Sequence, residues 1–175
     1  MKRVISGIAF FLIIWGGVLS AQNETNRGYI VHVGQQAPNF KIKLIDGQTI
    51  SLDQLREKVV VLQFTASWCS VCRKEMPHLE KEIWEPNKNK NFILIGVDYD
   101  EPVNKVIAFK KEMKITYPMA LDPGAEIFSK FAHKKAGVTR NVVINRSGKI
   151  VFLTRLYNVK EFNAMKNKIT SLLNR

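Results

Sequence analysis

Cys69 and Cys72 are the only cysteines in this chain of 175 residues, and they stand three positions apart. A disulfide between them closes a very short loop, so it removes little entropy from the unfolded chain and stabilises the fold weakly. Residues three apart on a helix are neighbours, which brings the two sulfur atoms within disulfide reach. The spacing therefore favours a reactive pair over a structural bridge.

A buried strand and a helix must position this pair. The run 59–64 is almost continuously apolar and rich in β-branched residues, as is typical of a central strand covered on both faces. Apolar side chains then recur at helical spacing over 70–84, and Pro77 is expected to kink this helix. At the helix N-terminus, free backbone N–H groups and the helix dipole stabilise a thiolate. We expect Cys69 to be the exposed nucleophile and Cys72 the shielded second thiol.

Such a pair supports thiol–disulfide exchange. The thiolate of Cys69 attacks a substrate disulfide, and Cys72 then attacks the Cys69 sulfur and releases the reduced substrate. The cycle needs no cofactor, and in reverse it oxidises a dithiol. A Cys-X-X-Cys pair can also form half of a zinc site. No second pair exists, however, and the three histidines are scattered at His32, His78 and His133. The ligand count favours redox chemistry without a metal.

The rest of the chain predicts an α/β fold with a central mixed β-sheet flanked by helices. Alternation over 40–44, an Asp-Gly turn at 46–47 and a return at 49–50 predict an N-terminal β-hairpin extension. A right-handed crossover makes the two buried strands parallel, so the cysteine pair lies at the carboxyl edge of the sheet. The other predicted elements are a buried strand at 92–97, helices at 51–55, 102–113, 125–131 and 160–173, and a hairpin formed by 142–144 and 150–153.

The N-terminal segment predicts export. Residues 1–21 combine a basic start with an uncharged, strongly apolar stretch, which is typical of a signal peptide. An uncleaved membrane anchor is the alternative, although the apolar stretch falls a little short of a spanning helix. Residues 22–36 are polar and turn-rich and are expected to be a linker before a domain at 37–175. Both interpretations predict a periplasmic protein or one at the extracytoplasmic face of the cell membrane.

The net charge of +12 comes from lysines scattered along the chain. No interleaving of arginine with aromatic residues suggests a surface that reads bases, so we expect no nucleic-acid partner. A solvated basic exterior explains the charge. Contact with the membrane is expected only through the N-terminal segment, if it stays uncleaved.

The run FTASWCSVCRKEMP at 64–77 resembles the active-site segment of the thioredoxin superfamily, and its Arg73, Glu75, Pro77 pattern is similar to the extracytoplasmic TlpA/ResA-like branch. The resemblance covers roughly 37–175. It implies a thioredoxin fold and disulfide exchange in the cell envelope. We further expect a monomer that reduces disulfide-containing envelope proteins, and a reductant in this location needs an electron donor, for which we expect a membrane thiol carrier. A specialist variant reduces the haem-attachment cysteines of apocytochrome c.

The resemblance assigns roles around the cysteine pair. Trp68 would shield the pair and shape the substrate groove; the alternative is an ordinary half-buried aromatic residue, and the two roles can coexist. Glu75 matches an acidic residue beside the pair and would handle protons for Cys72; the alternative is a solvated helix carboxylate. Gln63 stands where cytoplasmic thioredoxins keep a buried aspartate, and glutamine cannot titrate. We therefore expect that proton route to be absent.

The clearest departure from the family lies at residues 137–141. The family usually has a cis-proline opposite the cysteine pair, where this chain has Thr139. A cis bond before a residue other than proline costs ~2.5–4 kcal/mol, so a trans bond and a reshaped groove are expected. Val138 would offer backbone groups to an extended substrate. Arg140 would point at the cysteine pair and favour the thiolate, or lie on the surface and pair with a carboxylate.

Two other functions compete with disulfide reduction. A peroxiredoxin-like peroxidase needs the pattern Pro-x-x-x-Thr/Ser-x-x-Cys. Leu62 and Ala66 occupy those places relative to Cys69, and Thr65 and Cys69 do so relative to Cys72, so neither cysteine fits. A non-catalytic binding domain would keep the pair as a structural disulfide that glutathione does not open.

Overall fold

The computed structural model describes residues 27–174. The predicted signal or anchor segment, 1–21, lies outside this range. Among the residues described, no helix combines the length and the apolar character needed to cross a membrane.

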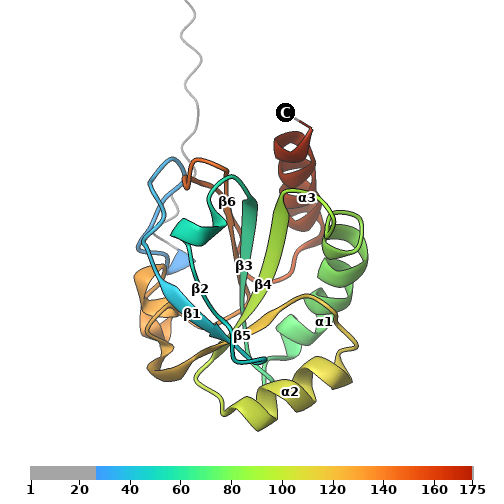
Figure 1. Cartoon of the computed structure of the whole chain (residues 1–175). Coiled ribbons are helices and arrows are strands. Elements are labelled where there is room, and N and C mark those ends of the chain that lie inside the picture. The colour runs from blue at the N-terminus through green and yellow to red at the C-terminus, as the bar shows by residue number, and fades with distance from the viewer. Residues whose placement is uncertain (1–26, 175) are drawn as a thin grey trace, which may run out of the picture.

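A seven-stranded mixed sheet forms the centre of the protein (Figure 1). Its strands are β1 (Lys41–Leu44), β2 (Thr49–Ser51), β3 (Val59–Thr65), β4 (Phe92–Tyr99), β5 (Met119–Asp122), β6 (Arg140–Ile144) and β7 (Ile150–Leu153). They lie in the order β2-β1-β5-β4-β3-β6-β7. The β3–β4 and β4–β5 pairs are parallel, and the other pairs are antiparallel. The predicted mixed sheet, its central parallel pair and the N-terminal hairpin β1–β2 are confirmed.

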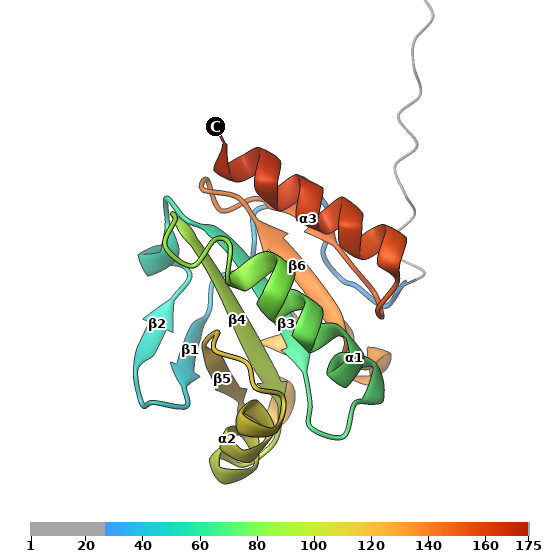
Figure 2. The ribbon, with the colours of Figure 1, turned by 90° about the vertical axis from the view of Figure 1, so that its right-hand side faces the viewer.

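Three α-helices cover one face of this sheet: α1 (Ser70–His78), α2 (Val103–Glu112) and α3 (Val159–Leu173). In Figure 2 α1 and α3 lie in front of the strands. All seven residues of β3 are buried, as its apolar run predicted. Successive side chains of a strand point to opposite faces. Gln63 accordingly faces Glu75 of α1, whereas Phe64 packs on Phe128 and Phe131 behind the sheet.

Short helical turns complete the fold. They are the 3-10 turns Asp53–Leu55, Pro123–Ala125, Phe128–Lys130 and Lys134–Ala136, and a π-helix, Leu79–Trp84, that continues α1. Together α1 and the π-helix span the helix predicted at 70–84. Pro77 has no N–H to donate within the helix. Just beyond it, the N–H of Leu79 is shared between the carbonyls of Glu75 and Met76, and the α-helix gives way to the π-helix there.

The helix predicted at 125–131 was wrong, because only the short turns Pro123–Ala125 and Phe128–Lys130 form there. Two further predictions were also wrong. Strand β5 was missed, because the Pro118 and Pro123 turn signals on either side hid four residues that pair with both β4 and β1. The expected linker was also wrong for residues 27–36. Tyr29 and Val31 are buried, and Tyr29 forms a bridge with Ala132. Two large apolar side chains among the turn residues anchor this segment to the domain.

Candidate active site

The cysteine pair lies where β3 passes into α1, at the carboxyl edge of the sheet. Cys69 and Cys72 form a disulfide with a Cα–Cα distance of 5.3 Å. Cys69 is the N-cap of α1, and its sulfur accepts a hydrogen bond from the Cys72 N–H at 3.1 Å. The helix N-terminus thus directs a backbone donor at this sulfur, which is the arrangement that favours a thiolate.

The two cysteines differ in exposure. Cys69 keeps 8% of its surface exposed and Cys72 keeps none. An incoming disulfide therefore reaches only Cys69, whereas Cys72 can attack only a sulfur that is already bonded to Cys69. This order matches a nucleophile followed by a second, shielded thiol.

Thr139 lies against both sulfurs. Its hydroxyl oxygen is 3.0 Å from the Cys69 sulfur and 3.0 Å from the Cys72 sulfur. No peptide bond among residues 27–174 is cis, so the expected trans bond is confirmed. The backbone of Thr139 has a positive φ of 65°, which is uncommon for a β-branched residue.

Val138 precedes Thr139 and is buried. Within the described part of the chain, neither its N–H nor its C=O has a hydrogen-bond partner. Both backbone groups of Thr139 are used internally: its N–H donates to Phe64 O, and its C=O accepts from Leu156 N–H. In the described part of the chain, Val138 thus differs from Thr139 in leaving both backbone groups unpaired.

Glu75 lies one helical turn beyond Cys72 and is buried. Its carboxylate accepts hydrogen bonds from Asn141 Nδ2 at 2.7 Å and from Gln63 Nε2 at 3.5 Å. The Tyr117 hydroxyl donates to Gln63 Oε1 at 2.8 Å and orients that amide. Burial raises the pKa of Glu75 from 4.5 to about 7, against the opposing effect of the two amide donors. The alternative of a solvated carboxylate is excluded.

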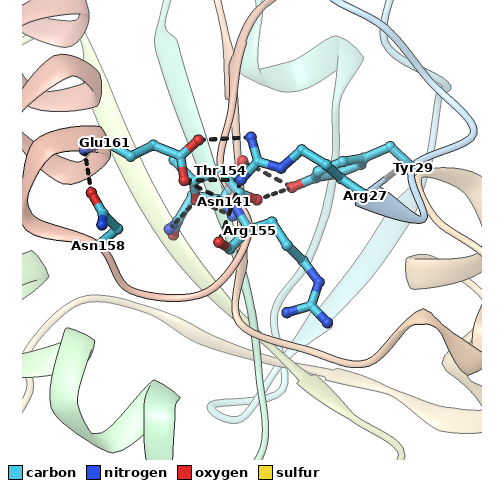
Figure 3. A network of polar contacts seen from close by, with 7 residues as sticks. All are labelled: Arg27, Tyr29, Asn141, Thr154, Arg155, Asn158 and Glu161. Atoms are coloured by element: carbon cyan, nitrogen blue, oxygen red, sulfur yellow. Dashed lines mark hydrogen bonds and ion pairs between the residues drawn. The ribbon is translucent and has the colours of Figure 1, made fainter. Parts of the chain in front are cut away.

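Asn141 also belongs to a polar network that reaches the N-terminal segment (Figure 3). Asn141 Nδ2 also donates to Thr154 Oγ1 at 2.9 Å, and the Tyr29 hydroxyl donates to Thr154 O at 2.5 Å. Arg27 forms a two-point ion pair with Glu161 of α3, at 2.7 and 2.9 Å. The segment before β1 therefore helps to hold the strand that carries Asn141.

Trp68 projects from the loop before Cys69 with 61% of its surface exposed, so it is not the half-buried aromatic residue of the alternative interpretation. The preceding residue, Ser67, is held from two sides. Its N–H and hydroxyl donate to the Glu101 carboxylate at 2.6 and 2.7 Å, and its C=O accepts from Arg73 Nε at 2.8 Å. The loop beneath the exposed indole is thus fixed by charged side chains.

A second buried carboxyl lies near this loop. Asp98 at the end of β4 is buried, and neither of its carboxyl oxygens has a hydrogen-bond partner within residues 27–174. Burial raises the pKa of Asp98 to about 8, and the nearby Glu101 charge adds to the effect. The protonated form of Asp98 is thus favoured to higher pH than in an ordinary aspartate. The only signal of Asp98 in the sequence is that it is the first of three acids, with Asp100 and Glu101, at the end of an apolar run.

Arg140 does not point at the cysteine pair. Its guanidinium donates to the carbonyls of Gly137 and Ala136 at 2.8 and 2.9 Å and lies 4.6 Å from the centre of the Tyr29 ring. The side chain is buried, so the alternative of a surface arginine is also wrong. Thr139, the residue just before β6, is the one whose side chain reaches the sulfurs.

Sequence reasoning missed Asn141, Thr154 and Tyr117 around Glu75. Gln63 was recognised only as a place where an acid is lacking. The signal that could have identified Asn141 is a polar residue directly before the apolar run Val142–Ile144 of β6. Among residues 27–174 no group of three His, Cys, Asp or Glu side chains is arranged to hold a metal.

This fold and this site define a thioredoxin-like thiol–disulfide oxidoreductase. A solved structure described as a putative protein disulfide isomerase from Bacteroides thetaiotaomicron is 57% identical, covers 85% of this chain and 94% of its own, and superposes with a TM-score of 0.82. The thiol-disulfide oxidoreductase ResA of Bacillus anthracis is 31% identical over 69% of this chain and 68% of its own. A second ResA, from Bacillus thuringiensis, is 29% identical over 86% of each chain. The model of the AhpC/TSA family matches residues 33–153, and the chain belongs to this family.

Proposed function

We propose that this enzyme works as a reductant of protein disulfides in the periplasm or at the extracytoplasmic face of the cell membrane. The observation that carries the proposal is the pairing of an accessible Cys69 with a fully shielded Cys72 one turn above the buried Glu75. Cys69 attacks the substrate and Cys72 resolves the mixed disulfide. A carboxyl whose pKa is about 7 can accept the Cys72 proton near neutral pH.

The substrate would lie across Trp68 and Val138. The exposed indole offers an apolar contact surface, and the free N–H and C=O of Val138 can pair with an extended segment, as in the addition of a strand. Thr139 shapes the groove between them. Extended protein segments, rather than small thiols, are therefore the substrate class we propose, and we expect a monomer to suffice.

The location and the partners belong to the same proposal. The apolar residues 1–21 support export, as a signal peptide or as an anchor. A reductant outside the cytoplasm needs electrons from a membrane thiol carrier. The matched ResA proteins are named thiol-disulfide oxidoreductases, and reduction of the haem-attachment cysteines of apocytochrome c is the specialist form of the function.

A redox titration of the mature domain tests the direction. The protein is equilibrated in graded thiol–disulfide buffers, its free thiols are alkylated, and the mass is read. A reduction potential of roughly −270 to −230 mV supports a reductant, whereas ~−120 mV makes the protein an oxidant. A value near ~−180 mV, typical of disulfide isomerase, would favour isomerisation, the activity for which the 57% identical relative is named. A pair that does not titrate would contradict enzymatic exchange.

The peroxidase alternative has its own assay. Neither cysteine stands in the peroxidatic pattern, so we expect no peroxide consumption by the reduced protein beyond that of a free thiol. Consumption many-fold faster, retained in Cys72→Ser, would favour a peroxidase.

A further inference from the structure

The Thr139 hydroxyl is placed between the two reactive sulfurs from a distant part of the chain. Thr139 lies 70 residues after Cys69, yet its Oγ1 is 3.0 Å from both sulfurs. Its backbone is held on both sides, through the Phe64 carbonyl at 3.1 Å and the Leu156 N–H at 2.8 Å. These bonds leave the hydroxyl little freedom to move away from the pair.

The backbone conformation supports a functional reason for this placement. A φ of 65° puts a β-branched residue in the left-handed region. Such conformations cost of order 1–3 kcal/mol and persist where the surroundings hold them, most often at active sites and ligand clamps. The strain here coincides with contact to both reacting atoms.

The chemistry of a hydroxyl fits a pair of sulfurs that take turns in carrying charge. A threonine hydroxyl has one proton to donate and turns freely about its C–O bond. A neutral sulfur is a weak acceptor, whereas hydrogen bonds to ionised groups are about twice as strong as neutral ones. The hydroxyl therefore interacts most strongly with whichever sulfur is a thiolate. A proline in this position has no such donor.

We propose that Thr139 is a catalytic residue whose hydroxyl donates first to the Cys69 thiolate and then, in the mixed disulfide, to the Cys72 thiolate. In the first step the Cys69 sulfur bonds to a substrate sulfur and the other substrate sulfur leaves as a thiolate. In the second step Cys72 bonds to Cys69 and the second substrate thiolate leaves. Two electrons pass from the dithiol to the substrate, while the Thr139 proton stays on its oxygen.

The experiment measures the acidity of Cys69 directly. The ultraviolet absorbance of the Cys69 thiolate is followed against pH in three proteins that all carry Cys72→Ser. One keeps Thr139, and the other two carry Thr139→Val or Thr139→Ser. Valine keeps the branched shape and removes the hydroxyl, whereas serine keeps the hydroxyl. We expect Thr139→Val to raise the midpoint by about one pH unit, a tenfold loss of thiolate at a given pH, and Thr139→Ser to stay near wild type.

Resolution of the mixed disulfide gives the second readout. With Cys72 present, a mixed disulfide formed on Cys69 should resolve about tenfold more slowly in Thr139→Val, and at nearly the wild-type rate in Thr139→Ser. Thermal unfolding checks that each variant is folded, and Thr139→Ala replaces valine if that variant is not.

The proposal would be overturned if the midpoint of the Cys69 titration were the same in Thr139→Val as in the protein that keeps Thr139. So would equal shifts in the variants with and without the hydroxyl, because backbone strain alone would then explain them. The inference concerns exchange in either direction. The role of Thr139 can therefore be disproved while the reduction potential still supports a reductant. The same role can also hold if the protein is an oxidant.

Discussion

Asn141 and Glu75 are joined by a hydrogen bond of 2.7 Å between two side chains that are both buried, although they lie 66 positions apart in the chain. The amide donates to the carboxylate, which stabilises its charged form, while burial destabilises that form. Burial is the larger effect, and the pKa of Glu75 is raised to about 7. A group poised near neutral pH beneath Cys72 is suited to proton transfer, and the predictions below test its role and that of Trp68.

Glu75→Gln removes the titrating group and keeps the shape of the side chain. If Glu75 accepts the Cys72 proton, the wild-type rate of mixed-disulfide resolution rises with pH around about 7. We expect the variant to resolve about 100-fold more slowly at neutral pH. Its rate should rise only toward the ordinary range of a thiol, near ~8.5. Single-turnover release of a fluorescent thiol from Cys69 measures this, and an unchanged profile would assign Glu75 no part in the step.

Asn141→Leu removes the stronger donor to Glu75 while keeping a similar volume. The hydrogen bond from Asn141 lowers the pKa of Glu75, so its loss should raise the midpoint of the pH–rate profile by about one unit. Thr154→Val is the matched control. It removes the second acceptor of the Asn141 amide without touching the carboxylate, and its midpoint should move much less. Equal midpoints in Asn141→Leu and wild type would count against this assignment.

The same carboxyl should make the stability of the fold depend on pH. The pKa of Glu75 is about 7 in the folded state, whereas its ordinary value, which applies to the unfolded chain, is 4.5. The contribution of Glu75 to the free energy of unfolding is therefore fully present below about pH 4.5 and is lost as the pH rises toward 7. In this pH range Glu75 is ionised in the unfolded chain but still protonated in the folded protein. The loss amounts to about 3 kcal/mol at most.

Urea unfolding at about pH 5 and about pH 8 measures this loss, and Glu75→Gln should lose less stability over the interval than wild type. The pKa of Asp98 is raised to about 8, so Asp98 also makes the fold less stable as the pH rises. Glu75→Gln should therefore keep part of the dependence of stability on pH. A wild-type stability that rises over this interval would contradict the sign of the prediction.

Trp68→Ala tests the contact surface beside the cysteine pair. Because 61% of Trp68 is exposed, the substitution should change the free energy of unfolding by no more than about 0.5 kcal/mol. The rate constant for reducing a protein disulfide should fall about tenfold, since a partner loses an apolar contact worth ~1–2 kcal/mol. Reduction of oxidised glutathione should change little.

The control for Trp68→Ala is Ile107→Ala, which changes an exposed apolar residue of α2, away from the cysteine loop. It should leave both rates at the wild-type level. If Trp68→Ala slowed the two substrates equally, the indole would act on the cysteine pair itself and not on substrate binding.

Much of the fold was predictable because it depends on local patterns. The apolar run of β3 led directly to its complete burial, and helical spacing defined the helix that follows over 70–84. Strand β5 was not predictable, since four residues between two proline turns gain their structure only by pairing with β4 and β1. Residues 27–36 were misassigned for a related reason, because two buried side chains outweigh a turn-rich composition.

The sequence by itself determined the chemistry of this protein. Two cysteines at the start of a helix after a buried strand define a redox pair, because helix geometry sets the distance between residues three apart. Only the tertiary structure decided what surrounds the pair. Thr139 and Asn141 reach Cys69 and Glu75 across 70 and 66 positions, and Arg140 between them points to the other face. Contacts between residues so far apart in the chain depend on sheet register and packing, which local sequence patterns do not reveal.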